Sequence, residues 1–398
     1  MKKETIWTKD FLRVSFSSFF MFMAFYMLMS ALPIYIVDVL NGEESQIGLV
    51  TTLFLLSSIL SRPFIGKWVD QFGRKKLLFI SLLLFAFASV LYIGLHSLFA
   101  LLILRFFHGF GFGMSTTVLG TVAADLIPAK RRGEGISYFG MFMNLAMVIG
   151  PFVGILIISK YDSMILFIVC AICSGISFLL SSRIAVPHIQ LMKKQEEKKR
   201  FQWSDVLETS ALRIACITGI LAFAYSGIIS FISVYAKEIG SVDDASYFFA
   251  IYAIMLVVAR PFAGRLFDSK GVNFIMYPGI VLYTIGMILL SVADSTVMFL
   301  LSGGIIGLGY GALVPCLQTL IVGQAMDNRR GVATSTFYAF YDTGVGIGSL
   351  VLGYVAMYTS YQIMYGVSVL FIVCAGILYY MKQNKDRIFV EKDERLSS

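Results

Sequence analysis

The sequence has 398 residues, of which 58% are hydrophobic and 14% charged, and its mean hydropathy is +0.81. Soluble domains carry about 25% charged residues, so this composition excludes a water-soluble globular protein and indicates helices that lie in lipid. The net charge of +8 is compatible with nucleic-acid binding, but the Lys and Arg residues gather in the connections on one side of the apolar runs, so we expect no nucleic-acid partner.

Apolar runs of about 20 residues or more, the length that spans a bilayer as a helix, recur along the chain. Twelve such runs lie at 11–37, 46–66, 77–95, 98–122, 133–158, 163–183, 212–236, 246–266, 274–293, 296–322, 332–357 and 361–381. The basic connections, among them Arg74–Lys76 and Lys130–Arg132, alternate with connections that offer only Lys160 and Lys237. The positive-inside rule therefore places both termini in the cytoplasm of a multi-pass protein of the cell (plasma) membrane.

The polar turn between the second and third runs occurs twice. The first copy contains Gly66, Asp70 and Gly73. The second copy contains Gly264, Asp268 and Gly271, each 198 residues further along the chain. The same offset relates Gly109, Gly111 and Gly113 to Gly307, Gly309 and Gly311, and Arg131–Gly133 to Arg329–Gly331. Six runs return the chain to its starting side, so the two copies are parallel. The sequence thus predicts an all-α membrane protein with two parallel six-helix bundles.

The domain boundaries follow from this repeat and from a basic, polar stretch between its copies. We predict an N-terminal six-helix bundle at 1–186, a cytoplasmic linker at 187–211, a C-terminal six-helix bundle at 212–381 and a cytoplasmic tail at 382–398. The five cysteines all fall inside apolar runs. We therefore expect neither a disulfide framework nor a metal site.

Asp70 and Asp268 lie at membrane ends, where a carboxylate is costly unless it is paired. The free N–H groups and the dipole at a helix amino terminus favour an anion. We expect Asp70 to bind the start of the run near Gly331 and Asp268 to bind the start near Gly133, latching the halves in an outward-open state. The alternative is a basic turn that only fixes orientation.

Three polar residues inside the runs are candidates for proton coupling. Arg105 lies about 12 Å into its predicted helix at 1.5 Å per residue, where an unpaired charge is costly, and its repeat counterpart is Gly303. Asp342 lies near mid-membrane and its counterpart is Asn144. We expect Arg105 and Asp342 to act in proton coupling or substrate binding. The alternatives are that Arg105 snorkels outward and that Asp342 forms a structural pair with Arg105 or a backbone group. His108 is a possible proton relay or a hydrogen-bonded packing residue.

Two stretches rich in glycine are expected to act as gate helices or as ordinary close packing. Gly150, Pro151 and Gly154 lie in the fifth run, and Gly344 and Gly348 in the eleventh. Proline removes a backbone hydrogen-bond donor, so Pro151 allows the fifth helix to bend. Glycine allows two helices to approach closely, so both stretches can contact a neighbouring helix. The residues expected to line a substrate cavity are Tyr26, Asn144, Phe223, Tyr225, Tyr310 and Tyr341.

The motifs resemble those of major facilitator superfamily transporters with twelve helices. Gly66-x-x-x-Asp70-x-x-Gly73-Arg74-Lys75 is similar to the loop signature of that family, Leu101-x-x-x-Arg105-x-x-His108-Gly109 to its fourth-helix signature with His where Gln is usual, and Ala146-x-x-x-Gly150-Pro151-x-x-Gly154 to its antiporter signature with Ala for the first Gly. The resemblance implies a pair between Arg74 and Asp125. It also implies a drug/proton antiporter-like protein.

We therefore expect a secondary transporter rather than an enzyme, exporting small amphiphilic or cationic compounds by proton-coupled alternating access. The alternative on the same scaffold is a dedicated metabolite exporter or a proton symporter for uptake. The expected partners are a small-molecule substrate, protons and the lipid bilayer, with a monomer as the working unit. No cofactor is expected, because the proton gradient supplies the energy.

Overall fold

A computed structural model describes residues 5–41, 44–186, 206–238 and 244–397 of the chain. Those residues form twelve α-helices and three short 3-10 helices, and they contain no strand. The α-helices are α1 (Lys9–Asp38), α2 (Glu44–Phe72), α3 (Arg74–Val90), α4 (Leu98–Leu126), α5 (Arg132–Lys160), α6 (Ser163–Ser182), α7 (Leu212–Glu238), α8 (Asp244–Lys270), α9 (Asn273–Ser291), α10 (Thr296–Gln324), α11 (Arg330–Tyr358) and α12 (Tyr361–Ser397). The all-α prediction is confirmed.

Eleven of the described helices are long and apolar enough to cross a membrane. The exception is α3, whose 17 residues extend about 25 Å at 1.5 Å per residue, less than the roughly 30 Å of a bilayer core. Large apolar side chains such as Phe99, Phe152 and Val297 are more than two-thirds exposed on the helix surfaces. Such side chains indicate lipid-facing surfaces, so the chain is a membrane protein.

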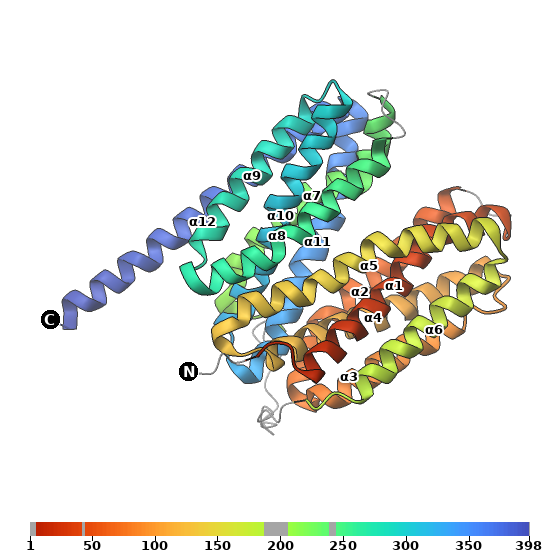
Figure 1. The fold of residues 1–398 in the computed structure, drawn as a ribbon, viewed down its shortest axis with the longest axis horizontal. Helices are drawn as coiled ribbons and strands as arrows, with labels where there is room; N and C mark the ends of the chain where they lie inside the picture. The colour runs from red at the N-terminus through yellow and green to blue at the C-terminus, as the bar shows by residue number, and fades with distance from the viewer. Residues whose placement is uncertain (1–4, 42–43, 187–205, 239–243, 398) are drawn as a thin grey trace. The chain divides into compact units, whose positions relative to one another are not determined.

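The helices group into two compact units (Figure 1). The first comprises Met1–Thr209 with Ala325–Ala339, and the second comprises Ser210–Gln324 with Phe340–Ser398. Helix α11 therefore begins within the first unit and continues in the second. Most of the predicted linker at 187–211 lies outside the described residues.

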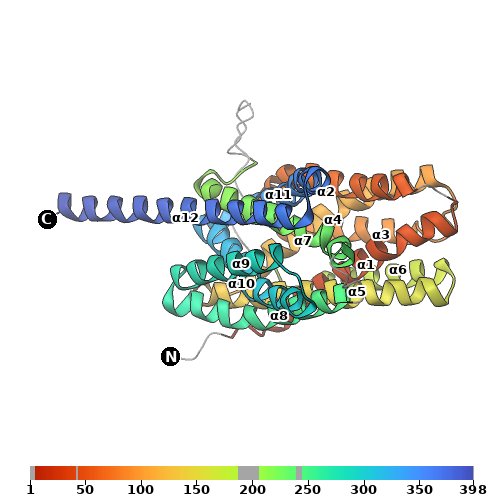
Figure 2. The same cartoon turned by 90° about the horizontal axis from the view of Figure 1, so that it is seen from above.

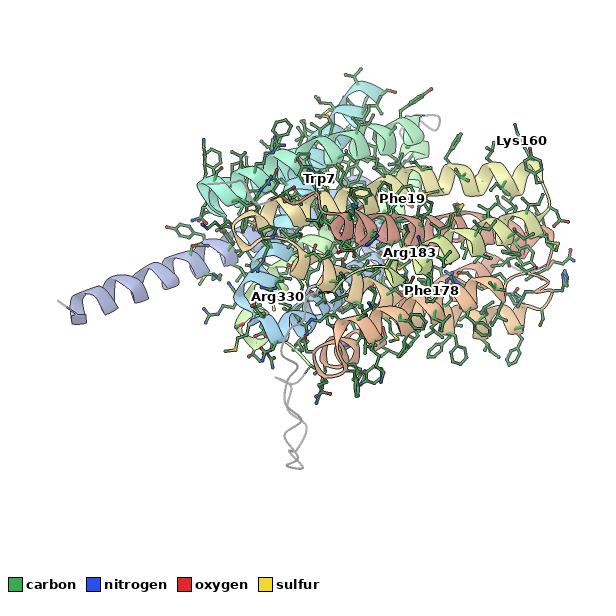
Figure 3. The ribbon with its side chains drawn as sticks, turned by 60° about the horizontal axis from the view of Figure 1, so that its bottom comes forward. Trp7, Phe19, Lys160, Phe178, Arg183 and Arg330 are labelled. Carbon is green, nitrogen blue, oxygen red and sulfur yellow. The ribbon has the colours of Figure 1, made fainter. Side chains whose placement is uncertain are left out.

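Each unit repeats the same packing pattern. In the first unit, α1 packs on α5 and α6, α2 on α4, and α3 on α4 and α6, and Figures 1 and 2 both show α1 beside α5 and α6. In the second unit, α7 packs on α12, α8 on α10, and α9 on α10 and α12. The polar connections lie at the helix ends, as Figure 3 shows for Arg330 and Lys160 at opposite ends of the first unit.

The structure confirms the 198-residue repeat at the level of single residues. Helices α4 and α10, and likewise α5 and α11, begin and end 198 residues apart. Gly73 and Gly271 both adopt positive φ angles, 93° and 86°, that residues other than glycine rarely adopt. In each unit this glycine ends the second helix, so that the third can begin within one or two residues.

The central glycines of α4 explain its close contact with α2. A Cβ atom on Gly109 would lie 2.2 Å from the carbonyl oxygen of Phe54, and one on Gly113 would lie 2.7 Å from that of Ser58. Both separations are shorter than any real Cβ contact, so only glycine permits this crossing. These glycines therefore serve helix packing.

Candidate functional site: a charged latch and two buried polar centres

Asp70 binds the amino terminus of α11 within the first unit. Its carboxylate, fully buried near the end of α2, accepts hydrogen bonds from the backbone N–H groups of Gly331 at 3.1 Å and Val332 at 2.9 Å. These N–H groups belong to the first turn of α11 and have no partner inside the helix. The contact expected between Asp70 and the start of this helix is therefore present.

Arg74 and Arg330 extend this contact into a charged latch, which we define as Asp70, Arg74, Asp125, Asp327 and Arg330. Arg74 pairs with Asp70 at 3.0 Å and with Asp125 at 3.0 Å, and it donates to the carbonyl oxygen of Asp327 at 2.8 Å. Arg330 pairs with Asp125 at 2.8 Å and with Asp327 at 2.5 Å. The predicted Arg74–Asp125 pair is confirmed, whereas the part played by Arg330 is new.

Two glycines allow the backbones of α2 and α11 to meet at the latch. A Cβ atom on Gly66 would lie 2.6 Å from the Cβ of Ser335, and one on Gly331 would lie 2.8 Å from a carboxylate oxygen of Asp70. The Ser335 hydroxyl also donates to the carbonyl oxygen of Arg62. Any larger residue at either glycine would therefore separate the carboxylate from its N–H donors.

A second attachment to the start of α11, missed in the sequence, comes from the end of the connection that precedes α7. Glu208 pairs with Arg329 at 2.8 Å, and its backbone N–H donates to the Thr336 hydroxyl at 2.9 Å. Glu208 is buried although it follows a strongly polar stretch. The available signal was the recurrence of the Arg-Arg-Gly triplet, which marks the start of α11 as a site for acids without showing which acid binds it.

The repeat counterparts Asp268 and Gly271 lie at the end of α8 in the second unit. Asp268 is half-buried, and Gly271 has open space where a Cβ would lie. The predicted contact of Asp268 with a helix start near Gly133 stays a prediction.

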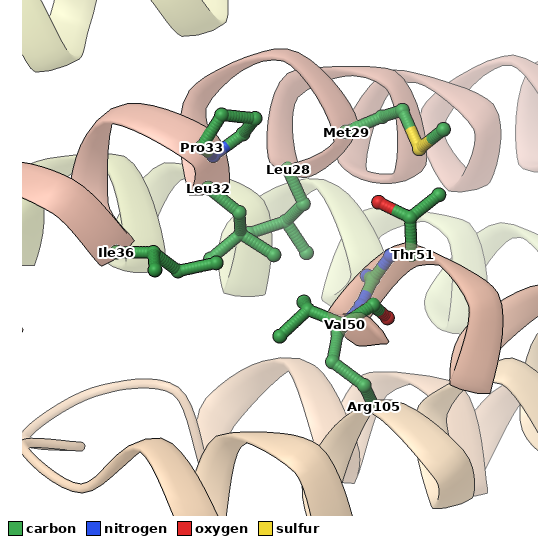
Figure 4. A pocket seen from close by; sticks show the side chains of 8 residues that line it. All are labelled: Leu28, Met29, Leu32, Pro33, Ile36, Val50, Thr51 and Arg105. Atoms are coloured by element: carbon green, nitrogen blue, oxygen red, sulfur yellow. The ribbon is translucent and has the colours of Figure 1, made fainter. Parts of the chain in front are cut away.

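Arg105 is buried between α4 and α2 at a small pocket (Figure 4). Its guanidinium carbon lies 4.1 Å from the ring centre of Phe54, and its Nε donates weakly to the carbonyl oxygen of Val50 at 3.5 Å. The pocket is otherwise lined by Leu28, Met29, Leu32, Pro33, Ile36, Val50 and Thr51. Within the described part of the chain, Nη1 of Arg105 has no hydrogen-bond partner and no carboxylate pairs with this residue. Arg105 therefore keeps one buried donor without an acceptor in the described residues.

His108 lies in a buried polar chain one turn further along α4. Its Nδ1 lies 3.1 Å from the Tyr92 hydroxyl and its Nε2 3.3 Å from the Ser89 hydroxyl, which in turn lies 2.8 Å from that of Ser174. Both ring nitrogens thus have partners inside the bundle, as expected for a packing histidine. Its role as a proton relay stays a prediction.

The glycines of α5 and α11 make close contacts in their own units. In the first unit, Cβ atoms on Gly150 and Gly154 would lie 2.6 Å from the Cβ of Tyr26 and 2.7 Å from the carbonyl oxygen of Met27. In the second unit, those on Gly344 and Gly348 would lie 2.2 Å from the carbonyl oxygen of Gly219 and 2.6 Å from that of Phe223. Pro151 lies between the α5 glycines. Their use as gates stays a prediction.

The remaining predicted cavity residues lie in two separate places. In the first unit, Tyr26 is half-buried and stacks on Phe22 with ring centres 6.0 Å apart, and Asn144 is buried on α5. In the second unit, Phe223 stacks on Phe371 at 4.2 Å and Tyr225 on Tyr310 at 4.2 Å. Also in the second unit, Tyr341 and Asp342 are half-buried neighbours on α11.

Comparison with known proteins identifies the family. The model of the Major Facilitator Superfamily matches residues 14–321 and 214–395. The chain is 24% identical over 368 residues to the multidrug resistance protein MdtG of Salmonella arizonae, covering 90% of this chain and 89% of that protein. It is 23% identical over 358 residues to the staphylopine export protein of Staphylococcus aureus, covering 87% and 90%. Its fold matches the crystal structure of the human organic anion transporter MFSD10 with a TM-score of 0.78 at 16% identity, covering 93% and 98%. The chain therefore belongs to the major facilitator superfamily and is a membrane transporter.

Proposed function

We propose that this transporter exports small amphiphilic or cationic compounds across the cell membrane in exchange for protons. The observation that carries the proposal is the contact of α5 with α1, where Gly150 and Gly154 leave no room for a Cβ beside Tyr26 and Met27. This Gly-Pro-x-x-Gly stretch resembles the fifth-helix signature of antiporters. The names of the MdtG and staphylopine relatives, a multidrug resistance protein and an exporter, support the direction.

The charged latch supports a transport cycle with two states. Its hydrogen bonds and ion pairs fix the start of α11 to α2, α3 and α4 through groups that can separate only together. We propose that the latch closes in one state and opens in the other. We further propose that α3 crosses the membrane as a twelfth span and that both termini are cytoplasmic.

Asp342 is the residue that we propose to bind and release the transported proton. It is a half-buried acid in a helix long enough to cross the membrane. A carboxylate in a low-dielectric setting gains affinity for protons, and wetting or a nearby cation reduces it again. Alternation between these environments would couple proton entry to substrate release.

The test is uptake of ethidium into everted membrane vesicles that are acidified inside. Asp342→Asn should abolish the uptake driven by the pH gradient, because the side chain no longer titrates, while the protein remains inserted. Asp162→Asn is the matched control, since Asp162 is an exposed acid that caps α6. Uptake by Asp342→Asn at the rate of the unaltered protein would remove Asp342 from proton coupling.

A dedicated metabolite exporter or an uptake symporter is the second candidate. The observation that favours it is the partnerless Nη1 of Arg105 at its pocket, which suits a substrate carboxylate. Direction separates the uptake symporter from either kind of exporter: export predicts accumulation in everted vesicles, and uptake predicts accumulation only in right-side-out vesicles with acid outside. The substrates accumulated, metabolites or amphiphilic cations, separate the two exporters.

A further inference from the structure

Five tyrosines gather inside the second unit, one from each of the helices α7 to α11. They are Tyr225, Tyr252, Tyr283, Tyr310 and Tyr341, and we call them the tyrosine cluster. The Tyr310 hydroxyl interacts electrostatically with the hydroxyls of the other four. The rings of Tyr225 and Tyr310 stack at 4.2 Å and 20°, and those of Tyr283 and Tyr310 meet at 5.3 Å. The five side chains therefore form one group of rings and hydroxyls.

The first unit holds four of these rings without the hydroxyls and a methionine in place of the fifth. At the 198-residue offset, Tyr252, Tyr283, Tyr310 and Tyr341 correspond to Phe54, Phe85, Phe112 and Met143. Between α1 and α7 the offset is 200, because Tyr35 donates to the carbonyl oxygen of Leu95 as Tyr235 does to that of Ala293. Tyr225 thus corresponds to Phe25.

Geometry confirms that these positions are equivalent. Phe25 stacks on Phe112 at 4.6 Å and 24°, matching the stack of Tyr225 on Tyr310. The glycine contacts agree as well. A Cβ on Gly109 would meet the carbonyl oxygen of Phe54 at 2.2 Å, and one on Gly307 would meet that of Tyr252 at 2.4 Å.

The fold therefore does not need the five hydroxyls, since the same backbone packs around phenylalanine and methionine in the first unit. In the second unit two of them carry a cost, whereas the Tyr283 hydroxyl donates to the carbonyl oxygen of Leu221 at 3.5 Å. The Tyr310 and Tyr252 hydroxyls are buried, and neither has a hydrogen-bond partner by distance and angle in the described residues. A buried hydroxyl without a partner destabilises the folded state. The presence of these hydroxyls therefore requires an explanation other than the stability of the fold.

We propose that the tyrosine cluster binds the transported compound, and that this compound has a flat apolar body with a carbonyl or carboxylate oxygen. The inference rests on the proposed export of amphiphiles and names the chemistry that they share. The ring faces stack on the flat body, and the unpartnered hydroxyls donate to the oxygen. The cluster is closed over in this structure, so binding requires the helices that bear it to part.

Charge favours an acceptor oxygen over a cation. Rings alone would suffice for a cation, so the phenylalanines of the first unit would serve that purpose equally. What tyrosine adds is a donor. The guanidinium of buried Arg260 also interacts electrostatically with Tyr225, and its positive charge attracts an oxygen acceptor and repels a cation.

The test is equilibrium dialysis of the purified full-length protein, with protein-free detergent micelles as the blank. The probes are coumarin, which has a carbonyl oxygen, 1-naphthoate, which has a carboxylate, and ethidium, a cation without either group. The variant Tyr252→Phe/Tyr310→Phe should bind coumarin or 1-naphthoate about tenfold more weakly, the loss expected for one or two hydrogen bonds. Binding of ethidium should not change.

Thermal unfolding of the same samples separates a binding role from a structural one. The double variant should unfold at a higher temperature than the unaltered protein, because it removes unpartnered hydroxyls and keeps rings that the first unit already accommodates. Tyr365→Phe is the control, since the Tyr365 hydroxyl donates to the carbonyl oxygen of Gly227 at 3.2 Å. It should lower the unfolding temperature and leave coumarin binding unchanged.

Three results would overturn the proposal. They are unchanged affinity of the double variant for both oxygen-bearing probes, a loss confined to ethidium, and a lower unfolding temperature of the double variant. Equilibrium dialysis uses no pH gradient. The binding result can therefore be interpreted even if Asp342 proves not to couple protons to transport.

Discussion

Removal of the Asp70 charge should release the start of α11 from the first unit. The variant Asp70→Asn would keep one oxygen acceptor but turn an NH2 group toward a backbone N–H, so one of the two hydrogen bonds from Gly331 and Val332 is lost. A hydrogen bond to a charged group contributes about 1.5 to 3 kcal/mol, and the remaining bond and the Arg74 pair also weaken. The expected loss is about 3 kcal/mol, or roughly a hundredfold in the opening equilibrium.

Hydrogen–deuterium exchange read by mass spectrometry measures this opening directly. Peptides that cover 325–339 should exchange roughly a hundredfold faster in Asp70→Asn, because local opening sets the exchange rate of protected amides. Asp268→Asn is the matched control at the repeat position and should leave the exchange of 325–339 unchanged. Equal protection of these peptides in Asp70→Asn and the unaltered protein would show that the carboxylate does not hold α11.

Two further substitutions test separate contacts. Glu208→Gln should weaken the partly exposed pair with Arg329 by about 1 to 2 kcal/mol and raise exchange in 325–339 less than Asp70→Asn does; unchanged exchange would mean that this pair is incidental. Gly154→Ala should lower the unfolding temperature in detergent, since its Cβ would lie 2.7 Å from the Met27 carbonyl oxygen and overpacking costs about 1 to 3 kcal/mol. Gly175→Ala, with open space at its Cβ, is the control, and equal unfolding temperatures for the two variants would contradict the packing argument.

The sequence predicted the parts of the latch that the repeat marks. Asp70 and Gly331 occur in blocks that recur at one offset, and a buried acid near a helix start has few partners other than the N–H groups of that start. Glu208 could not be predicted, because a single acid in a polar stretch has no periodic partner. Its burial follows from tertiary contacts with Arg329 and Thr336 that no local pattern encodes.

The interior residues were harder to predict because all faces of these helices are apolar. Hydropathy identifies a span but not its rotation, so Tyr225 and Tyr310 were selected as cavity residues while Tyr252 and Tyr283 were not. The signal that would have selected Tyr252 and Tyr283 lies in the repeat, where tyrosines of the second unit stand at positions that hold phenylalanines in the first unit. Reading it required the offset of 200 between α1 and α7, which the contacts of Tyr35 and Tyr235 establish.

Comparison of the two units separates what the fold requires from what transport requires. Glycines at the helix crossings recur in both units, because the same backbones must approach closely. Two polar features do not recur: Arg105 corresponds to Gly303, and the cluster around Tyr310 corresponds to side chains without hydroxyls around Phe112. A duplicated scaffold holds packing residues constant by necessity, so a buried polar group present in one copy alone has no architectural reason to be there. The first unit thus contributes a guanidinium and the second a set of hydroxyls. Within the described residues, Nη1 of Arg105 and the hydroxyl of Tyr310 are buried donors without an acceptor, and each would bind a substrate oxygen in its own unit.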